Sequence, residues 1–194
     1  MIAYGMIRDA FPRLAPPRVQ IYTNAFNQWF PVYGIINPRR VAAFIAQVGH
    51  ESGGLRWTAE IWGPTDQQRR YEPPSTLAAR LGNSEPGDGA WFKGRGLIQI
   101  TGRSNYTQIS RAFDIDFLSN PALLESPNMA VRSACWWWSS RSLNEIADLD
   151  TVESFRRITR IINGGFNGWE DRLKRWEAAK KIFAIPNDNP ATVA

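Results

Sequence analysis

Two glutamates, Glu51 and Glu60, lie nine residues apart and carry the side chains that acid–base chemistry needs. Glu51 ends a largely apolar run, and Glu60 lies in a loop-like stretch beside Ile61 and Trp62. Hydrolysis of a glycosidic bond uses such a pair: one protonated carboxyl donates to the leaving oxygen, and an ionised one activates water or attacks the sugar. Because burial raises the pKa of a carboxyl, we interpret Glu51 as the acid and Glu60, in the wetter stretch, as the base.

The same spacing allows a second interpretation, in which Glu51 is a solvated helix-end residue and Glu60 a surface charge. On spacing alone this second interpretation is the stronger, because many helices end in Glu-Ser-Gly. His50, directly before the first glutamate, is expected to be structural and not a proton shuttle, since the proposed chemistry needs only carboxylates.

The element that must position Glu51 is a helix over residues 37–50. Asn37 is a suitable N-cap and Pro38 suits the first helical position. Apolar residues then recur at i, i+3, i+4 and i+7, which is the spacing of one buried helical face: Val41, Phe44, Ile45 and Val48. Gly53 and Gly54 predict the turn that reverses the chain after Glu51.

The remaining chain reads as mostly helical. Residues 1–17 contain three prolines and are expected to be irregular, and Pro31 is expected to end a short helix over residues 19–29. Further helices are predicted over residues 75–81, 104–113, 127–138, 151–162 and 169–183. Asp150 with Glu153 predicts a capping box for the helix over residues 151–162. We expect one catalytic domain over residues 1–184, with 185–194 as a C-terminal tail.

One short β element is predicted around residues 97–101, where the pattern has a period of two. Ile98 and Ile100 would face the core, and Gln99 and Thr101 would present an amide and a hydroxyl on the opposite face. Glycines before and after this stretch indicate close backbone approach or a tight hairpin. A nucleotide loop is not expected, because the Gly-x-Gly precedes a strand and not a helix.

The composition limits the class of protein. Among 194 residues, 43% are hydrophobic and 21% charged, which is ordinary for a soluble globular chain. A net charge of +5 favours a polyanionic partner such as nucleic acid, an anionic membrane face or an acidic wall polymer. Nucleic acid is disfavoured because the basic residues form no single patch. One histidine and one cysteine leave little for a metal site, and we expect no metal or cofactor.

The N-terminus lacks the continuous apolar core of a secretory signal, and no apolar run is long enough for a membrane span. We therefore expect synthesis in the cytosol, no stable membrane insertion, and help from elsewhere for any export. The single Cys135 is expected to be a small buried hydrophobe, so the fold does not depend on a disulfide.

Several segments in order resemble glycoside hydrolase family 19, the plant-type chitinase family, and more closely its bacteriophage endolysin branch. The segments are FIAQVGHESGG, GRGLIQITGRSNY, NPALLESPNMAVRSACWWW with SRSLNEIAD, and ITRIINGGFNGWEDR. Together they cover about residues 37–183. The resemblance implies a lysozyme-like, mainly helical α+β fold with a small β element beside an active-site cleft.

Residue by residue, the resemblance implies that Glu51 matches the family's general acid and Glu60 the second carboxylate of the endolysin branch. Plant members of the family place their base further along the chain than Glu60. Thr101 matches a residue that helps to hold the attacking water. The resemblance also implies that Gln99, Asn105 and Asn163 line the sugar cleft and that Arg172 supports the carboxylates. We count Tyr106 among the substrate-binding residues as well, and expect it in the core with its hydroxyl near the site.

The expected activity is that of an endolysin, cutting β-1,4 bonds of the peptidoglycan glycan strand by inversion. As a monomer lacking a signal, it would reach the wall or periplasm through a holin-like partner. Two other classes stay open: a chitinase that acts on N-acetylglucosamine polymers, and a wall protein that binds glycan without cutting it.

Overall fold

A computed structural model describes residues 1–184, and in this part of the chain the architecture is mainly α-helical. The elements are α1 (Tyr4–Ala10), α2 (Pro16–Val32), α3 (Pro38–Glu51), α4 (Asp66–Arg69), α5 (Thr76–Leu81), α6 (Asp88–Trp91), α7 (Arg103–Phe113), a 3-10 helix η1 (Pro121–Glu125), α8 (Pro127–Ser139), α9 (Leu143–Asp148), α10 (Val152–Asn163) and α11 (Trp169–Ile182). The predicted tail, 185–194, lies outside the described residues.

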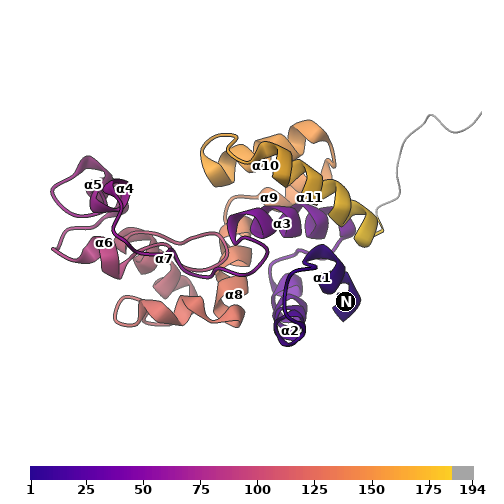
Figure 1. The fold of residues 1–194 in the computed structure, drawn as a ribbon, viewed down its shortest axis with the longest axis horizontal. Coiled ribbons are helices and arrows are strands. Elements are labelled where there is room, and N and C mark those ends of the chain that lie inside the picture. The colour runs from indigo at the N-terminus through magenta and orange to yellow at the C-terminus, as the bar shows by residue number, and fades with distance from the viewer. Residues whose placement is uncertain (185–194) are drawn as a thin grey trace, which may run out of the picture.

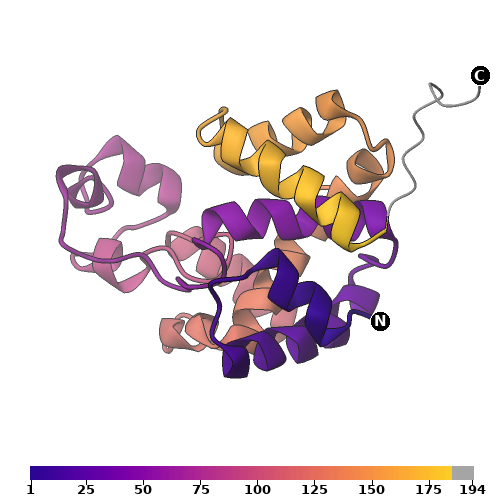
Figure 2. The same cartoon turned by 45° about the vertical axis from the view of Figure 1, so that its right-hand side comes forward.

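Helix α3 is the central element. The Asn37 side chain caps it by accepting a hydrogen bond from the backbone N–H of Arg40 at 2.9 Å, as the sequence predicts. Its residues 41–49 are all buried. The reason is visible in Figures 1 and 2: α3 runs between α10 and α11 on one side and α1 and α2 on the other. Helix α3 ends at Glu51, at the end that faces the segment carrying α4 to α7.

The expectation of irregular structure at the N-terminus is wrong. Residues 4–10 form α1, and α2 begins at Pro16, because Pro16 and Pro17 occupy the first helical positions, where a missing N–H is tolerated. Pro31 does not end α2 either but lies inside its last turn. Helix α2 keeps a buried apolar face, including Phe26 and Phe30, and this packing offsets the hydrogen bond that proline removes.

The predicted strand over residues 97–101 is also wrong. Among the described residues only isolated bridges occur, which pair Arg95 with Ala59 and with Ile100. Residues 96–99 form a tight turn between the bridged residues, and Gln99 has a φ of 56°, in the left-handed region that no strand residue adopts. Leu97 is fully buried instead of facing away from Ile98 and Ile100. The tight hairpin predicted from the glycines is therefore confirmed, whereas the alternating apolar pattern does not correspond to a strand.

Three short helices, α4, α6 and α9, were not predicted. One predicted cap is also different: Thr151, with Ser154 and not Asp150 with Glu153, forms the capping box of α10. The predicted helices at residues 75–81, 104–113, 127–138, 151–162 and 169–183 are present within one or two residues of their expected ends.

Two apolar clusters hold the fold together. The larger cluster surrounds α3, and the smaller one lies against α7 and η1. Helix α8 joins them, because Trp138 is fully buried in the larger cluster, Trp136 packs on the smaller, and Trp137 contacts both. Three consecutive tryptophans cannot share one face of a helix, so α8 is buried on more than one side. In the stretch from residue 1 to 184, no helix has the length and apolar character needed to cross a bilayer.

An ion pair fixes the start of α3 to the end of α9. Arg40 donates to both carboxylate oxygens of Asp148, at 2.8 and 2.5 Å, and Asn37 donates to the first oxygen at 2.8 Å. The hydrogen bonds from Arg40 hold the pKa of Asp148 below its ordinary value of 3.8, against the opposing effect of partial burial. Protonation of Asp148 therefore weakens the contact that holds the start of α3, the helix that carries Glu51.

The packing of Phe44 gives a first prediction. Its ring meets Phe30 at 5.2 Å and Trp138 at 5.3 Å, both edge to face. We expect Phe44→Ala to lower the free energy of unfolding by about 3–5 kcal/mol, because it removes apolar contacts and leaves a cavity. Leu149→Ala is the control, since Leu149 is 63% exposed, and should change stability by less than about 0.5 kcal/mol. Chemical denaturation measures both, and equal losses would contradict the assignment of Phe44 to the core.

The Asp148 pair gives a second prediction. A depressed carboxyl pKa contributes stability that is present above the unfolded pKa and is lost as pH falls through the folded pKa. Asp148→Asn should therefore reduce the free energy of unfolding at neutral pH and give a shallower decline below about pH 4. Denaturant titrations from neutral to acidic pH measure this effect. Two curves that stay parallel over the whole range would show that Asp148 has no part in the acid sensitivity.

Candidate active site

Glu51 is paired with a buried arginine. Arg172, on α11, is 1% exposed and donates from Nη2 to Oε1 of Glu51 at 2.5 Å. The Glu51 side chain is 19% exposed, so one side faces the protein and the other is accessible. The immediate polar neighbour of Glu51 is therefore the guanidinium of Arg172, whereas the sequence indicated apolar surroundings only. The ion pair fixes where this carboxylate points.

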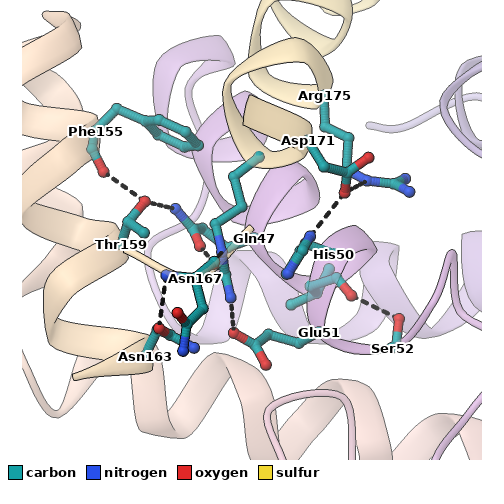
Figure 3. A network of polar contacts seen from close by, with 12 residues as sticks. Gln47, His50, Glu51, Ser52, Phe155, Thr159, Asn163, Asn167, Asp171 and Arg175 are labelled. Atoms are coloured by element: carbon teal, nitrogen blue, oxygen red, sulfur yellow. Dashed lines mark hydrogen bonds and ion pairs between the residues drawn. The ribbon is translucent and has the colours of Figure 1, made fainter. Parts of the chain in front are cut away.

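A chain of hydrogen bonds supports Arg172, and Figure 3 shows its members Gln47, Thr159 and Phe155. Its Nη1 donates to Oε1 of Gln47 at 2.6 Å, and the Gln47 amide donates to the hydroxyl of Thr159 at 2.8 Å. The Thr159 hydroxyl donates in turn to the backbone carbonyl of Phe155 at 3.1 Å. Gln47 and Thr159 are both fully buried. A buried guanidinium needs such partners, because an unpaired buried charge is costly.

The loop between α10 and α11 completes the support. The backbone carbonyl of Asn167 accepts from Nε of Arg172 at 3.2 Å, and Oδ1 of Asn163 accepts from the backbone N–H of Asn167 at 3.2 Å. Asn163 is the residue expected to line the sugar-binding site, and the structure places it one hydrogen bond away from the carbonyl that positions Arg172. The Oδ1 atom of Asn163 thus holds the loop by accepting this hydrogen bond.

His50 fixes the start of α11. Its Nδ1 lies 2.7 Å from Oδ2 of Asp171, which also accepts from Nε of Arg175 at 2.7 Å. Partial burial would raise the pKa of Asp171, but the hydrogen bonds from Arg175 and His50 prevail and lower it. A Cβ at Gly168 would lie 2.1 Å from the His50 ring, and Gly168 has a φ of 71°, so only glycine fits there. These contacts agree with the structural role expected for His50.

Glu60 is oriented by a separate set of donors. Oε1 accepts from the side-chain amide of Gln68 at 2.9 Å, and Oε2 accepts from the backbone N–H of Gly94 at 3.1 Å. The backbone N–H of Glu60 donates to the carbonyl of Gly94 at 2.8 Å. Burial, and then the charge of Glu60, raise the pKa of the nearby Tyr71. Glu60 is therefore half-buried and held at both oxygens, whereas the sequence suggested a loose, wet loop.

Gln99 and Thr101 lie against the same segment. A Cβ at Gly94 would approach Oε1 of Gln99 to 2.6 Å and Oγ1 of Thr101 to 3.1 Å, so Gly94 is the position that lets these side chains reach the backbone beside Glu60. The Thr101 hydroxyl donates to the carbonyl of Gln99 at 3.0 Å, and the Asn105 amide donates to the carbonyl of Thr101 at 2.7 Å. Glu60, Gln99, Thr101 and Asn105 thus form one connected group.

Tyr106 lies behind that group. It is fully buried, its hydroxyl donates to the carbonyl of Lys93 at 2.8 Å, and it accepts from Nη1 of Arg95 at 3.0 Å. Burial raises the pKa of Tyr106 to about 12, so the hydroxyl stays protonated at neutral pH. The expected position of Tyr106 in the core is confirmed, and because it has no exposed surface it supports the site from within and is not available to bind substrate.

The predicted site residues therefore fall into two groups. Glu51, Arg172 and Asn163 are joined by hydrogen bonds around the end of α3, and Glu60, Gln99, Thr101 and Asn105 around the turn that contains Gly94. Inverting carboxylates are separated by a water molecule, so separate anchoring of Glu51 and Glu60 suits that chemistry. Among residues 1–184, no cluster of three or more His, Cys, Asp or Glu side chains is arranged to hold a metal ion.

Sequence reasoning missed three supporting residues. Gln47 lies one helical turn before Glu51 on an otherwise apolar face, and this spacing is a signal for a shared partner. Gln68 follows Thr65 in the pattern of a capping box, which the structure contains. Gly168 gave no signal, because its requirement comes from His50, more than a hundred residues away in the sequence.

The buried ion pair gives a third prediction. Arg172→Met should lower the free energy of unfolding by about 3–5 kcal/mol, because Gln47 and Glu51 lose their partner. Glu51→Gln should cost less, about 1–2 kcal/mol, since the amide oxygen still accepts from Arg172. Arg157→Met, an exposed change on α10, is the matched control and should stay within about 0.5 kcal/mol. Thermal and denaturant unfolding measure all three, and a loss at Arg172 no larger than that at Arg157 would contradict this account.

Comparison with known proteins identifies the family. Residues 23–177 match the family described as chitinase class I, glycoside hydrolase family 19. A glycosyl hydrolase family 19 domain-containing protein of Haemophilus influenzae is 32% identical over 201 residues, covering 92% of this chain and 96% of that protein. Endochitinase 1 of Gossypium hirsutum is 35% identical over 182 residues, covering 78% of this chain but 55% of that enzyme. The chain thus spans nearly all of the bacterial relative and about half of the plant one.

Solved structures agree in fold. Chitinase C from Streptomyces griseus HUT6037 superposes with a TM-score of 0.71 at 24% identity, covering 94% of this chain and 76% of that one. A bacterial family 19 chitinase gives a TM-score of 0.69 at 19% identity, covering 95% of both chains. These likenesses confirm the expected mainly helical, lysozyme-like fold, with only isolated β-bridges among the described residues. The chain therefore belongs to glycoside hydrolase family 19, the chitinase class I family, and is a glycoside hydrolase.

Proposed function

We propose that this enzyme hydrolyses β-1,4-glycosidic bonds of the peptidoglycan glycan strand, with Glu51 as the acid and Glu60 as the base. The observation that carries the proposal is that each carboxylate is fixed by its own donors: Glu51 by buried Arg172, and Glu60 by Gln68 and the backbone of Gly94. Two carboxylates of fixed direction are what a single-step displacement by water requires.

In the proposed reaction, Glu51 donates its proton to the oxygen of the leaving sugar as the glycosidic bond breaks. Glu60 accepts a proton from a water molecule, whose oxygen attacks the anomeric carbon from the opposite face and inverts it. The Thr101 hydroxyl and the Gln99 amide, which lie against Gly94, hold that water. Asn105 and Asn163 contribute amides to the sugar. Arg172 is a positioning residue that orients Glu51, and its charge steadies the carboxylate once the proton has left.

The choice of peptidoglycan rests on charge. Chitin is an uncharged polymer, whereas peptidoglycan carries carboxylates on its peptide substituents, and the chain has a net charge of +5. An excess of positive charge raises the local concentration of a polyanion and speeds encounter with it. In the finer form of the proposal the enzyme is a phage-type endolysin acting as a monomer at the wall, and it depends on a holin-like partner for access.

Chitin is the second candidate substrate. The observation that favours it is the 35% identity to Endochitinase 1 of Gossypium hirsutum over 78% of this chain. Both polymers contain N-acetylglucosamine joined by β-1,4 bonds, so the same carboxylate pair can act on either. An enzyme that prefers peptidoglycan to chitin must therefore have groups that recognise the lactyl-peptide substituent, which chitin lacks.

A fourth prediction separates catalysis from fold. Glu51→Gln should reduce the release of reducing ends from purified peptidoglycan by about 10²–10⁴-fold, because the amide cannot donate the proton. Glu60→Gln should cost a similar factor through loss of the base. Glu177→Gln, an exposed glutamate on α11, is the matched control and should retain full activity. Thermal unfolding of each variant shows whether the loss is chemical.

Product analysis decides the substrate. Reducing ends released from peptidoglycan but not from chitin oligosaccharides support the proposal, and the reverse result assigns the enzyme to chitin. Mass spectrometry of the muropeptides shows which sugar carries the new reducing end. Proton NMR of the first product resolves its anomer, and retention of configuration would exclude the single-step mechanism. Undiminished digestion by Glu51→Gln would exclude the carboxylate assignment itself.

A further inference from the structure

A basic pocket lies at the junction between the α1–α2 connection and the segment that joins Glu51 to Glu60. It has a volume of about 230 Å³ and is lined by Arg13, Leu14, Ala15, Arg18, Arg56 and Trp57. We call it the Arg13–Trp57 pocket. Three of its six lining residues are arginines, and none is acidic. None of the catalytic assignments above uses any of them.

The arginines of this pocket are not neutralised by the protein. Within residues 1–184, no ion pair includes Arg13, Arg18 or Arg56. Arg18 is fixed by neutral groups, since Nη2 donates to the carbonyl of Leu55 at 2.8 Å and to the hydroxyl of Tyr22 at 3.4 Å. Its Nε is enclosed and has no hydrogen-bond partner among the described residues. A partly buried cation without a counter-charge favours an external anion.

Trp57 supplies a flat apolar surface at the same place. It is 50% exposed, and Arg56 lies over its ring at 5.5 Å. The turn at Gly53 holds the ring, because a Cβ there would lie 2.9 Å from Cδ1 of Trp57 and Gly53 has a φ of 59°. An exposed, fixed indole beside arginines offers a face for a sugar ring and donors for a carboxylate.

We propose that the Arg13–Trp57 pocket binds a carboxylate-bearing muramoyl-peptide unit of the wall polymer, outside the catalytic carboxylate pair. The sugar ring lies on Trp57, and the arginines pair with a carboxylate of the lactyl-peptide substituent. The volume of about 230 Å³ suits the carboxylate-bearing end of that substituent and not the whole unit, since sites that enclose drug-sized ligands are typically about 300–1,000 Å³. This inference rests on the proposed function, because it supplies the group that distinguishes peptidoglycan from uncharged chitin.

The test uses the full chain with nitrogen-15 labelling and follows the indole N–H signal of Trp57, assigned by its absence in Trp57→Phe. The disaccharide tetrapeptide GlcNAc–MurNAc-tetrapeptide is expected to shift this signal, and tetra-N-acetylchitotetraose is not. In Arg13→Gln/Arg56→Gln, the affinity read from this signal should fall about tenfold. Added salt should reduce wild-type affinity as well, because the contacts are partly exposed.

Two further variants separate binding at the pocket from a general effect of positive charge. Arg80→Gln/Arg111→Gln removes the same charge from exposed positions outside the pocket and should leave the affinity unchanged. Trp57→Ala removes the ring without a change of charge and should reduce retention of the protein on peptidoglycan sacculi in a sedimentation assay. Matching thermal unfolding curves show that each variant is folded.

The inference is overturned if the muramoyl probe leaves the indole signal unmoved, if both double variants weaken binding equally, or if the signal responds only to vesicles of anionic phospholipid. Digestion of peptidoglycan by the wild type is measured separately. Full digestion with an unresponsive pocket overturns this inference alone, and a responsive pocket without digestion overturns the proposed function alone.

Discussion

A single buried cation organises the end of α3 that carries Glu51. Arg172 is 1% exposed, and its guanidinium reaches Gln47, Glu51 and the carbonyl of Asn167 at once. Burial of a charge is costly unless every donor finds a partner, so this arginine dictates what its surroundings must contain. It requires a polar residue in the apolar face of α3, a carbonyl from the α10–α11 loop, and a carboxylate at the end of α3. The position of Glu51 is therefore fixed by the need of a buried arginine for a charged partner.

The constraint continues into the loop before α11. Arg172 reaches Glu51 only if α11 begins at the right place, and that start is set by Gly168 pressed against His50. His50 precedes Glu51 on α3, so the residue that holds the loop and the residue that the arginine orients are adjacent in the chain. The His50 side chain points to Asp171 (Figure 3), whereas the Glu51 side chain pairs with Arg172. The two anchors together fix α11 along α3.

How much of this could be predicted depends on whether the signal is local. Helix α3, its Asn37 cap and the carboxylate at its end follow from a period of 3.6 and one capping residue, which are local properties. The turn around Gln99 was misread as a strand, because alternation of apolar residues over five positions cannot distinguish a strand from a tight turn whose side chains are buried by the rest of the fold. Pro16 and Pro17 were misread because proline both begins and breaks helices. Arg172 meets Gln47 and Glu51 across more than 120 residues of chain, and Glu60 meets Gly94 across 34 residues, so no local pattern predicts which segments come together.

The relation between the two carboxylates depends on the short segment between them. At its start, the Ser52 hydroxyl accepts from the backbone N–H of Leu55 at 2.8 Å, and the Ser52 carbonyl accepts from Trp57 at 3.0 Å. At its end, the carbonyl of Thr58 accepts from Gly96 and the N–H of Glu60 donates to Gly94, both at 2.8 Å. The segment is therefore tied to α3 at one end and to the glycine-rich turn at the other, so a displacement of that turn moves Glu60, Gln99 and Thr101 together relative to Glu51. In the proposed mechanism, the groups that hold the water therefore stay with Glu60, and the separation of Glu51 from Glu60 depends on the position of this turn.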